Sequence, residues 1–222
     1  MFAYHTRVAA QLMPLSTLAS PAGRPIAPET HPVHDQLAPL FPFGGLIRGS
    51  VVSVGSPALA LALLAPLSHA GSWCAATGLP GLGLAAAADA GIDLRRLVLV
   101  PRPAAQWATA VATQLDGFDA ILLRPPQHAS HTEARRLAAR ARERRSTLLL
   151  LGTWPQQVDL DLRVERSVWS GLHHGYGRLT EQECTIAVRG RGAAARERRA
   201  TVRLPLALPL TSHSQPEGVP SS

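Results

Sequence analysis

Short apolar runs alternate with helical patterns through the middle of the chain. The runs are SVVSV, WCAAT, RLVLV, FDAILL and STLLLL, at residues 50–54, 73–77, 96–100, 118–123 and 146–151. They lack polar alternation, which predicts strands that are covered on both faces. Their alternation with helices predicts βαβ units. The pattern therefore predicts an α/β fold with a mainly parallel central sheet flanked by helices.

Four helices are expected between these strands. They span residues 57–69, 83–91 and 104–115, and a fourth follows the capping box of Ser130 and Glu133. In this fourth helix one face is apolar and the other carries Arg. The basic face is interpreted either as a contact for DNA phosphates or an acidic partner, or as a solvated outer surface.

After residue 151 the pattern changes. VDLDLRVERSVWSGL alternates apolar and polar residues with no helix behind it, and CTIAVRG and RATVRLPL follow. These segments predict antiparallel strands that close one edge of the sheet. Residues 37–206 then form the domain. Residues 1–36 are predicted to be an extended or disordered arm, and residues 207–222 a disordered tail, because both are rich in Pro, Ser and Thr.

Composition narrows the function. The formal net charge is +7, and all 22 basic residues are Arg. This surplus favours acidic partners, either nucleic acid or an acidic protein face. Cys74 and Cys184 are too few for a zinc cluster and are expected to be reduced and packed. No apolar run approaches the roughly 20 residues of a membrane span, so a cytoplasmic protein without membrane contact is predicted.

The junction of the first strand and helix resembles a phosphate loop without its binding groups. Such loops need G-x-x-x-x-G-K-[ST], whose amides, Lys and hydroxyl hold the phosphates and Mg²⁺. Here Gly55 matches the first glycine, Ser56 and Pro57 lead directly into the helix, and no Lys or Arg follows before Gly71. We interpret Gly55, Ser56 and Pro57 as a vestigial loop that binds no nucleotide or other cofactor.

The carboxylate that would hold Mg²⁺ through water is also missing at the expected place. The strand AILL ends in Arg124, and Asp119 lies at its start. The chain is therefore predicted not to be an enzyme. The alternative is an ATPase with an atypical phosphate loop.

Several segments together resemble a known family. GGLIRGSVVSVGS resembles the opening of the RecA-type core. The later segments LGLAAAADAGIDLRRLVLVPRPAAQWATAVATQL and VWSGLHHGYGRLTEQECTIAVRGRG resemble the ImuA-type RecA-like accessory proteins of actinobacterial inducible mutagenesis, and the order and spacing of all segments agree. The resemblance implies a RecA-like core. It also implies a non-catalytic adaptor role in translesion DNA synthesis within the SOS response, with an ImuB-type polymerase-like protein and an error-prone replicative-type polymerase as partners.

Candidate contact residues lie in two places. RGRGAAARERR forms a basic tip between two strands, and its arginines could contact a partner or DNA directly, or only keep a mobile hairpin soluble; they are Arg189, Arg191, Arg196, Arg198 and Arg199. Trp154, beside Pro155 in a loop, is a candidate partner contact, whereas the other tryptophans are expected to pack in the core and on the sheet.

Metal binding is not predicted. His128 with His131, and His173 with His174, lack further ligands at metal-binding spacing. Asp159 and Asp161 lie on the same side of an alternating strand and could bind Mg²⁺, but ion pairs with the nearby Arg163 and Arg166 are expected instead.

Overall fold

The computed structural model describes residues 27–204 apart from residues 174 and 175, and it leaves the side chains of residues 171–181 undescribed. The strands are β1 (Thr30–His31), β2 (Leu46–Ile47), β3 (Val51–Val54), β4 (Cys74–Thr77), β5 (Leu97–Val100), β6 (Ala120–Leu123), β7 (Thr147–Leu150), β8 (Leu160–His173), β9 (Tyr176–Gly190) and β10 (Arg198–Leu204). The α-helices are α1 (Pro57–His69), α2 (Leu84–Asp89), α3 (Trp107–Gly117) and α4 (His131–Arg144), and short 3-10 turns are η2 (Ala38–Leu40), η3 (Leu94–Arg96) and η4 (Gly192–Ala194).

Eight strands form one sheet in the order β10-β9-β8-β3-β7-β6-β4-β5. From β8 to β5 every neighbouring pair is parallel, whereas β9 is antiparallel to both β8 and β10. The predicted α/β fold with antiparallel strands at one edge is confirmed. The alternating segment that forms β8 has a double role, because it pairs parallel to β3 on one side and antiparallel to β9 on the other.

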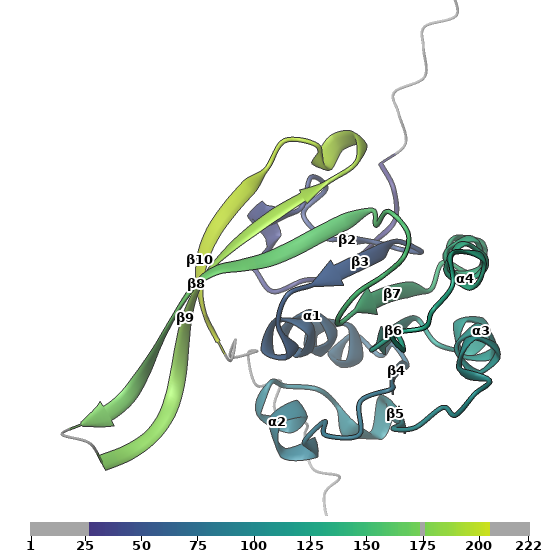
Figure 1. Cartoon of the computed structure of the whole chain (residues 1–222). Coiled ribbons are helices and arrows are strands. Elements are labelled where there is room, and N and C mark those ends of the chain that lie inside the picture. The colour runs from purple at the N-terminus through teal and green to yellow at the C-terminus, as the bar shows by residue number, and fades with distance from the viewer. Residues whose placement is uncertain (1–26, 174–175, 205–222) are drawn as a thin grey trace, which may run out of the picture.

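Helices cover both faces of the parallel strands (Figure 1). α1 and α2 lie on one face, and α3 and α4 on the other. α4 begins as predicted, because the capping box is present. The side chain of Ser130 accepts a hydrogen bond from the amide of Glu133, and the carboxylate of Glu133 accepts one from the amide of Ser130. α3 begins at Trp107, three residues later than residue 104, because Ala104 adopts a left-handed conformation with φ +56°.

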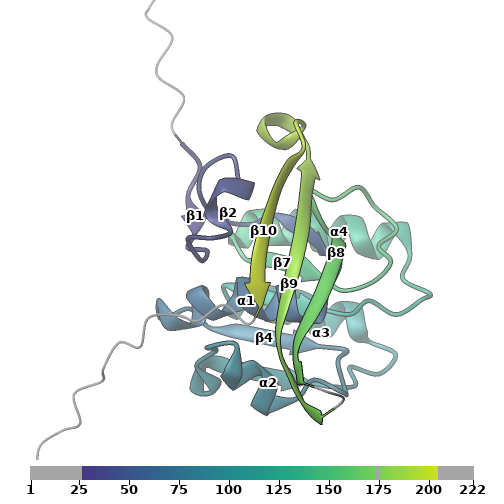
Figure 2. The same ribbon diagram turned by 90° about the vertical axis from the view of Figure 1, so that its left-hand side faces the viewer.

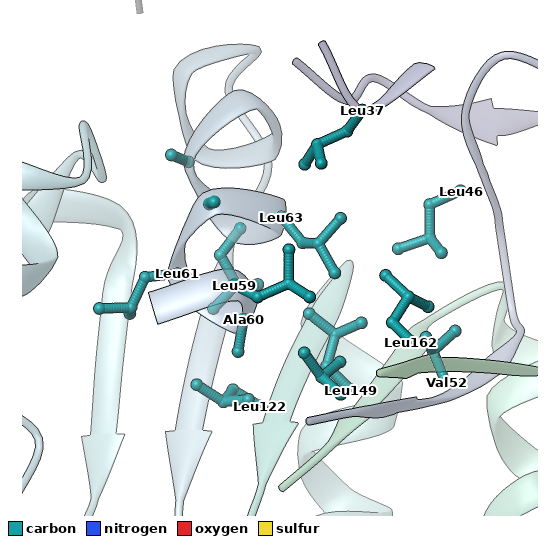
Figure 3. Close-up of a cluster of buried hydrophobic side chains, with 14 of the residues drawn as sticks. Leu37, Leu46, Val52, Leu59, Ala60, Leu61, Leu63, Leu122, Leu149 and Leu162 are labelled. Carbon is teal, nitrogen blue, oxygen red and sulfur yellow. The ribbon is translucent and has the colours of Figure 1, made fainter. Parts of the chain in front are cut away.

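α1 lies at the centre of the larger core. Every residue from Leu59 to Ser68 is buried, because the helix is covered on most sides and not only by the sheet. Figure 3 shows Leu59 and Leu63 of α1 near Leu37 of the N-terminal segment and Leu149 of β7. The absence of a polar face on this helix follows from that environment.

The N-terminal segment adds a small two-stranded sheet beside β10 (Figure 2). β1 pairs antiparallel with β2, and His31 is fully buried there. Residues 27–36, which belong to the predicted arm, therefore contribute to packing. The predictions for residues 1–26 and 207–222 concern parts of the chain outside the described residues.

The β8–β9 hairpin is longer than the rest of the sheet and extends past α1 and α2 (Figure 1). Its register shifts between Val164 and Arg166 and again between Ser170 and Leu172, so each shift marks an irregularity in the pairing. From Glu165 to Ser170 the side chains are exposed. This part of the hairpin has left the layer that the helices cover.

Both cysteines are free and buried, as predicted. The expectation for the tryptophans holds for Trp107, which is 2% exposed, but is wrong for two others. Trp73 is 45% exposed just before β4, and Trp169 is 52% exposed on the projecting hairpin. Among the described residues, no helix is both long enough and apolar enough to cross a membrane.

Candidate functional site

The candidate site lies at the carboxyl ends of the parallel strands, where open α/β sheets bind their ligands. The β3–α1 junction is at its centre. The amide of Gly55 donates a hydrogen bond to the carbonyl of Leu162 in β8, over 2.8 Å. A Cβ atom at Gly55 would lie 3.1 Å from that carbonyl and 3.4 Å from the Cα atom of Arg163. The close approach of β8 thus gives this glycine a packing reason that involves no phosphate.

The first turn of α1 has few amides left for an anion. Pro57 has no N–H group, and the amide of Leu59 donates to the hydroxyl of Ser56 over 3.3 Å. The amide of Ala60 donates to the Ser56 carbonyl over 3.0 Å. Only the amide of Ala58 remains in this turn to face a ligand, whereas a phosphate loop offers several.

A cleft of about 530 Å³ opens beside this junction. Its walls come from α1, the β4–α2 connection, α2, the ends of β6, β7 and β10, and the β8–β9 hairpin. Most of the lining is apolar, and its charged side chains are Arg124 and Asp89. The lining residues are Pro57, Ala58, Leu61, Ala62, Leu79, Gly81, Leu82, Gly83, Ala86, Asp89, Ala90, Arg124, Leu151, Trp169, Gln182 and Leu204. We refer to this space as the carboxyl-edge cleft.

The end of β6 brings an arginine to the cleft, where a nucleotide hydrolase would place a carboxylate. Arg124 follows Leu123 directly, and its amide donates to the carbonyl of Thr77. Asp119 lies at the opposite edge, as predicted. There it accepts a hydrogen bond from the amide of Trp73 and lies 3.6 Å from the Arg48 guanidinium.

The amino edge of the sheet carries a polar network around Asp159. This carboxylate accepts a hydrogen bond of 2.9 Å from the amide of Val51, contacts Arg191 and lies 3.4 Å from Arg142. Burial works against its ionisation, but these three donors outweigh burial and hold the pKa of Asp159 below its usual value. The predicted ion pairing of Asp159 is thereby confirmed, but its partners are Arg142 and Arg191 and not the expected Arg163 and Arg166.

Asp161 forms an ion pair of 2.6 Å with Arg163, also as predicted. Among the described residues no group of three or more His, Cys, Asp or Glu side chains is arranged to hold a metal ion.

The predicted basic tip is only partly available for contacts. Arg191 pairs with Asp159, and Arg199 pairs with Glu165 at 3.0 Å and Glu197 at 2.5 Å. The other three candidate arginines of the tip have no carboxylate partner among the described residues; they are Arg189, Arg196 and Arg198. A contact role for the tip remains a prediction that now centres on these three side chains.

The basic face of α4 is also engaged in part. Arg140 and Arg144 both pair with Asp116 of α3, and Arg145 lies 2.8 Å from Glu29. These pairs join the helix to its neighbours, which favours the structural interpretation of that face over a phosphate contact.

Of the two aromatic candidates, the structure favours the one that the sequence interpretation missed. Trp154 is half-buried against the core beneath α3 and α4, and its indole N–H is buried without a described partner. Trp169 instead lines the carboxyl-edge cleft with half of its surface exposed. Its apolar neighbour Val168, 48% exposed, was a usable signal, because two consecutive apolar residues interrupt the alternation of β8.

Comparison with known proteins covers about half of the chain, and the family match stops before β8. Residues 39–156 match the family model described as the MT3502 N-terminal domain. The chain is also similar to a protein of Mycobacterium tuberculosis, "Uncharacterized protein Rv3395c", with 35% identity over 102 residues. That alignment covers 45% of this chain and 50% of the relative. The matched region contains β3 and the helices α1, α2, α3 and α4.

Proposed function

We propose that this chain, which belongs to the MT3502 N-terminal domain family, is a non-catalytic RecA-like adaptor in mutagenic translesion DNA synthesis. In this role it recruits or stabilises an ImuB-type polymerase-like protein and, through it, an error-prone polymerase. The resemblance of two ordered sequence segments to ImuA-type proteins, after an opening that resembles the RecA-type core, supports the pathway. The cytoplasm is the proposed location.

One observation carries the non-catalytic part of the proposal: the β3–α1 junction is closed. The amide of Gly55 donates to β8, Ser56 accepts the hydrogen bonds of the Leu59 and Ala60 amides, and Pro57 has no N–H group. Triphosphate would meet few available amides and a mostly apolar wall, with neither an ammonium nor a magnesium carboxylate. An apolar cleft with an exposed indole is instead typical of surfaces that bind protein segments.

Two measurements test the proposal. Calorimetric titration of the full chain with a non-hydrolysable ATP analogue and Mg²⁺ is expected to give no binding heat, whereas a saturable heat would support the ATPase alternative. Purification of the tagged chain from DNA-damaged cells is expected to enrich the polymerase-like partner relative to undamaged cells. Recovery of only unrelated enzymes would contradict the adaptor role.

Direct DNA binding is kept as a second candidate, because three tip arginines lack carboxylate partners in the described structure. It predicts single-stranded DNA affinity that falls steeply with salt and is lost in the triple variant Arg189→Ala, Arg196→Ala, Arg198→Ala. Arg163→Ala is the matched control, because that arginine is exposed on the adjacent strand and paired with Asp161.

A further inference from the structure

The guanidinium of Arg124 belongs to a row of strand ends that is otherwise apolar. β7, β6 and β4 are neighbours in the sheet, and their ends place Leu151, Arg124 and Leu79 side by side in the carboxyl-edge cleft. The two leucines are 5% and 8% exposed, whereas Arg124 is exposed. Among the described residues, no carboxylate forms an ion pair with Arg124. An unpaired positive charge therefore lies between two apolar groups.

The other walls of the cleft are also mostly apolar. α1 contributes Leu61, and Figure 3 shows Leu61 and Leu63 on opposite sides of this helix. Trp169 forms the wall on the side of the hairpin and is 52% exposed. Asp89, on α2, is the acidic residue of the lining. A cleft of about 530 Å³ with such walls can bury several apolar side chains of an occupant.

An occupant of the cleft would change the environment of Arg124. Solvent reaches this side chain in the described structure, but an apolar group that covered Leu79 and Leu151 would remove that solvent. Burial of a guanidinium without a partner is strongly unfavourable, whereas a carboxylate that accepts two of its hydrogen bonds compensates for the lost water. An occupant that buries the apolar walls must therefore bring a carboxylate to the end of β6. The net charge of +7 also favours an acidic occupant.

We infer that the carboxyl-edge cleft binds a short apolar peptide segment of a partner protein, and that a carboxylate of this segment pairs with Arg124. The apolar side chains of the segment pack on Leu61 and Trp169, and the carboxylate gives the contact its selectivity. The inference rests on the proposed adaptor function, which requires a surface for a partner, and it specifies the chemistry of that surface.

Two blocked pentapeptides test this chemistry on the full chain. Each has two Leu on either side of a central residue, which is Glu in one probe and Gln in the other. In calorimetric titrations the Glu probe is expected to bind saturably and about tenfold more tightly than the Gln probe, because the amide cannot neutralise the guanidinium. Equal affinities would overturn the inference. Binding of neither probe would also overturn it, and would show that another occupant, such as a second copy of the chain, fills the cleft.

The variant Arg124→Met removes the charge but keeps an unbranched apolar side chain. It is expected to bind the Glu probe about tenfold more weakly than the parent chain does, and the Gln probe no more weakly. Arg135→Met is the matched control, because Arg135 is exposed on α4, which covers the other face of the sheet. Circular dichroism checks that both variants are folded. An equal loss of affinity in both would show that only the net charge of the chain acts, which overturns the inference.

Nuclear magnetic resonance of the isotope-labelled full chain locates the bound probe. Amide signals of residues 79–90 and of Arg124 are expected to shift when the Glu probe is added, because these residues surround the cleft. Amide signals of α4 serve as the internal control and should not move. Shifts confined to other parts of the chain would place the binding site outside the cleft and overturn the inference.

Recovery of the polymerase-like partner from DNA-damaged cells separates this inference from the proposed function. Arg124→Met should reduce that recovery, and Arg135→Met should not. If the parent chain and both variants recover the partner equally, the adaptor function stands and the inference fails. If the parent chain recovers no such partner but binds the two probes as expected, the inferred chemistry of the cleft stands and the adaptor function fails.

Discussion

The two edges of the central sheet differ in chemistry. At the amino edge, Asp119 and Asp159 are held by backbone amides and arginines, and His31 is buried nearby. At the carboxyl edge, the strands end in a mostly apolar cleft with Arg124 and Asp89 as its charged lining residues. Open α/β sheets usually concentrate polar ligand-binding groups at the carboxyl edge. In this chain the polar network lies at the amino edge and is structural, whereas the carboxyl edge, where such sheets usually bind ligands, is mostly apolar.

Because the two edges differ, substitutions at the amino edge should mainly change stability, and substitutions at the carboxyl edge should mainly change binding. Groups at the amino edge are mutually satisfied, so their loss should mainly affect folding. The carboxyl edge exposes an indole and an apolar wall that folding leaves incompletely covered by the described residues, so changes to its exposed side chains should mainly affect binding. The backbone of the carboxyl edge is the exception, because the strand ends pack closely there.

The largest effect is expected at that backbone. Gly78 has φ +74°, and a Cβ atom there would lie 2.5 Å from the carbonyl of Arg124. Gly78→Ala should lower the free energy of unfolding by about 2–4 kcal/mol through backbone strain and overpacking, measured by urea unfolding. Gly81→Ala is the control, since nothing lies within 4 Å of its Cβ position, and it should change stability by less than about 0.5 kcal/mol. Equal losses would refute the close-packing explanation.

The amino edge should make stability depend on pH through His31. Burial first, and then the charge of Arg48, lower its pKa from 6.5 to about 4, while Asp119 acts in the opposite direction. The unfolded chain therefore binds a proton more readily, and stability should fall by about 3 kcal/mol as pH drops from 6.5 to 4. Above pH 6.5 this contribution is fully present.

Urea midpoints measured between pH 4 and 8 check this expectation. His31→Leu removes the titrating group and should flatten the pH dependence in that window. If the parent chain and the variant lose stability in parallel, another group is responsible.

A smaller effect is expected for the carboxylate that joins β3 to β9. Asp159→Asn removes the charge that faces Val51, Arg142 and Arg191, and should cost about 1–2 kcal/mol. Asp161→Asn, which breaks only an exposed pair with Arg163, should cost less than about 0.5 kcal/mol. Similar unfolding free energies for both variants would show that the amino-edge network contributes little.

The smallest effect on stability is expected for the exposed indole of the cleft. Trp169→Ser should change the unfolding free energy by less than about 0.5 kcal/mol, because half of the side chain is in solvent. It should nevertheless reduce recovery of the polymerase-like partner. Trp73→Ser removes a similarly exposed indole at the amino edge and should leave recovery unchanged. Loss of the partner in both variants, or in neither, would break the distinction between the edges.

Much of the fold was predictable because it depends on local patterns. The uninterrupted apolar runs predict β3, β4, β6 and β7, and the capping box of Ser130 and Glu133 predicts the start of α4. The late start of α3 was not predictable, because it depends on the left-handed conformation of Ala104. Pairing of β8 with β3 was also missed, since alternation indicates an exposed face but does not identify a neighbour.

From the sequence, only the missing nucleotide-binding groups of the candidate site could be predicted. The missing lysine after Gly55 and the arginine at position 124 are visible in the sequence. The packing reason for Gly55 and the role of Trp169 in the cleft are not, because both depend on where β8 lies. Likewise, the partners of Arg191 and Arg199 come from distant segments, so the sequence overestimated the free charge of the basic tip.

The sequence alone determined the order of strands and helices, the burial of both cysteines and the absence of a phosphate-binding lysine, because periodicity and residue type are local properties. Tertiary structure decided which strands are neighbours, which arginines are paired and which tryptophans are exposed. Those outcomes depend on strand pairing between residues more than a hundred positions apart, as between Val52 and Leu160, and no local pattern specifies such a register.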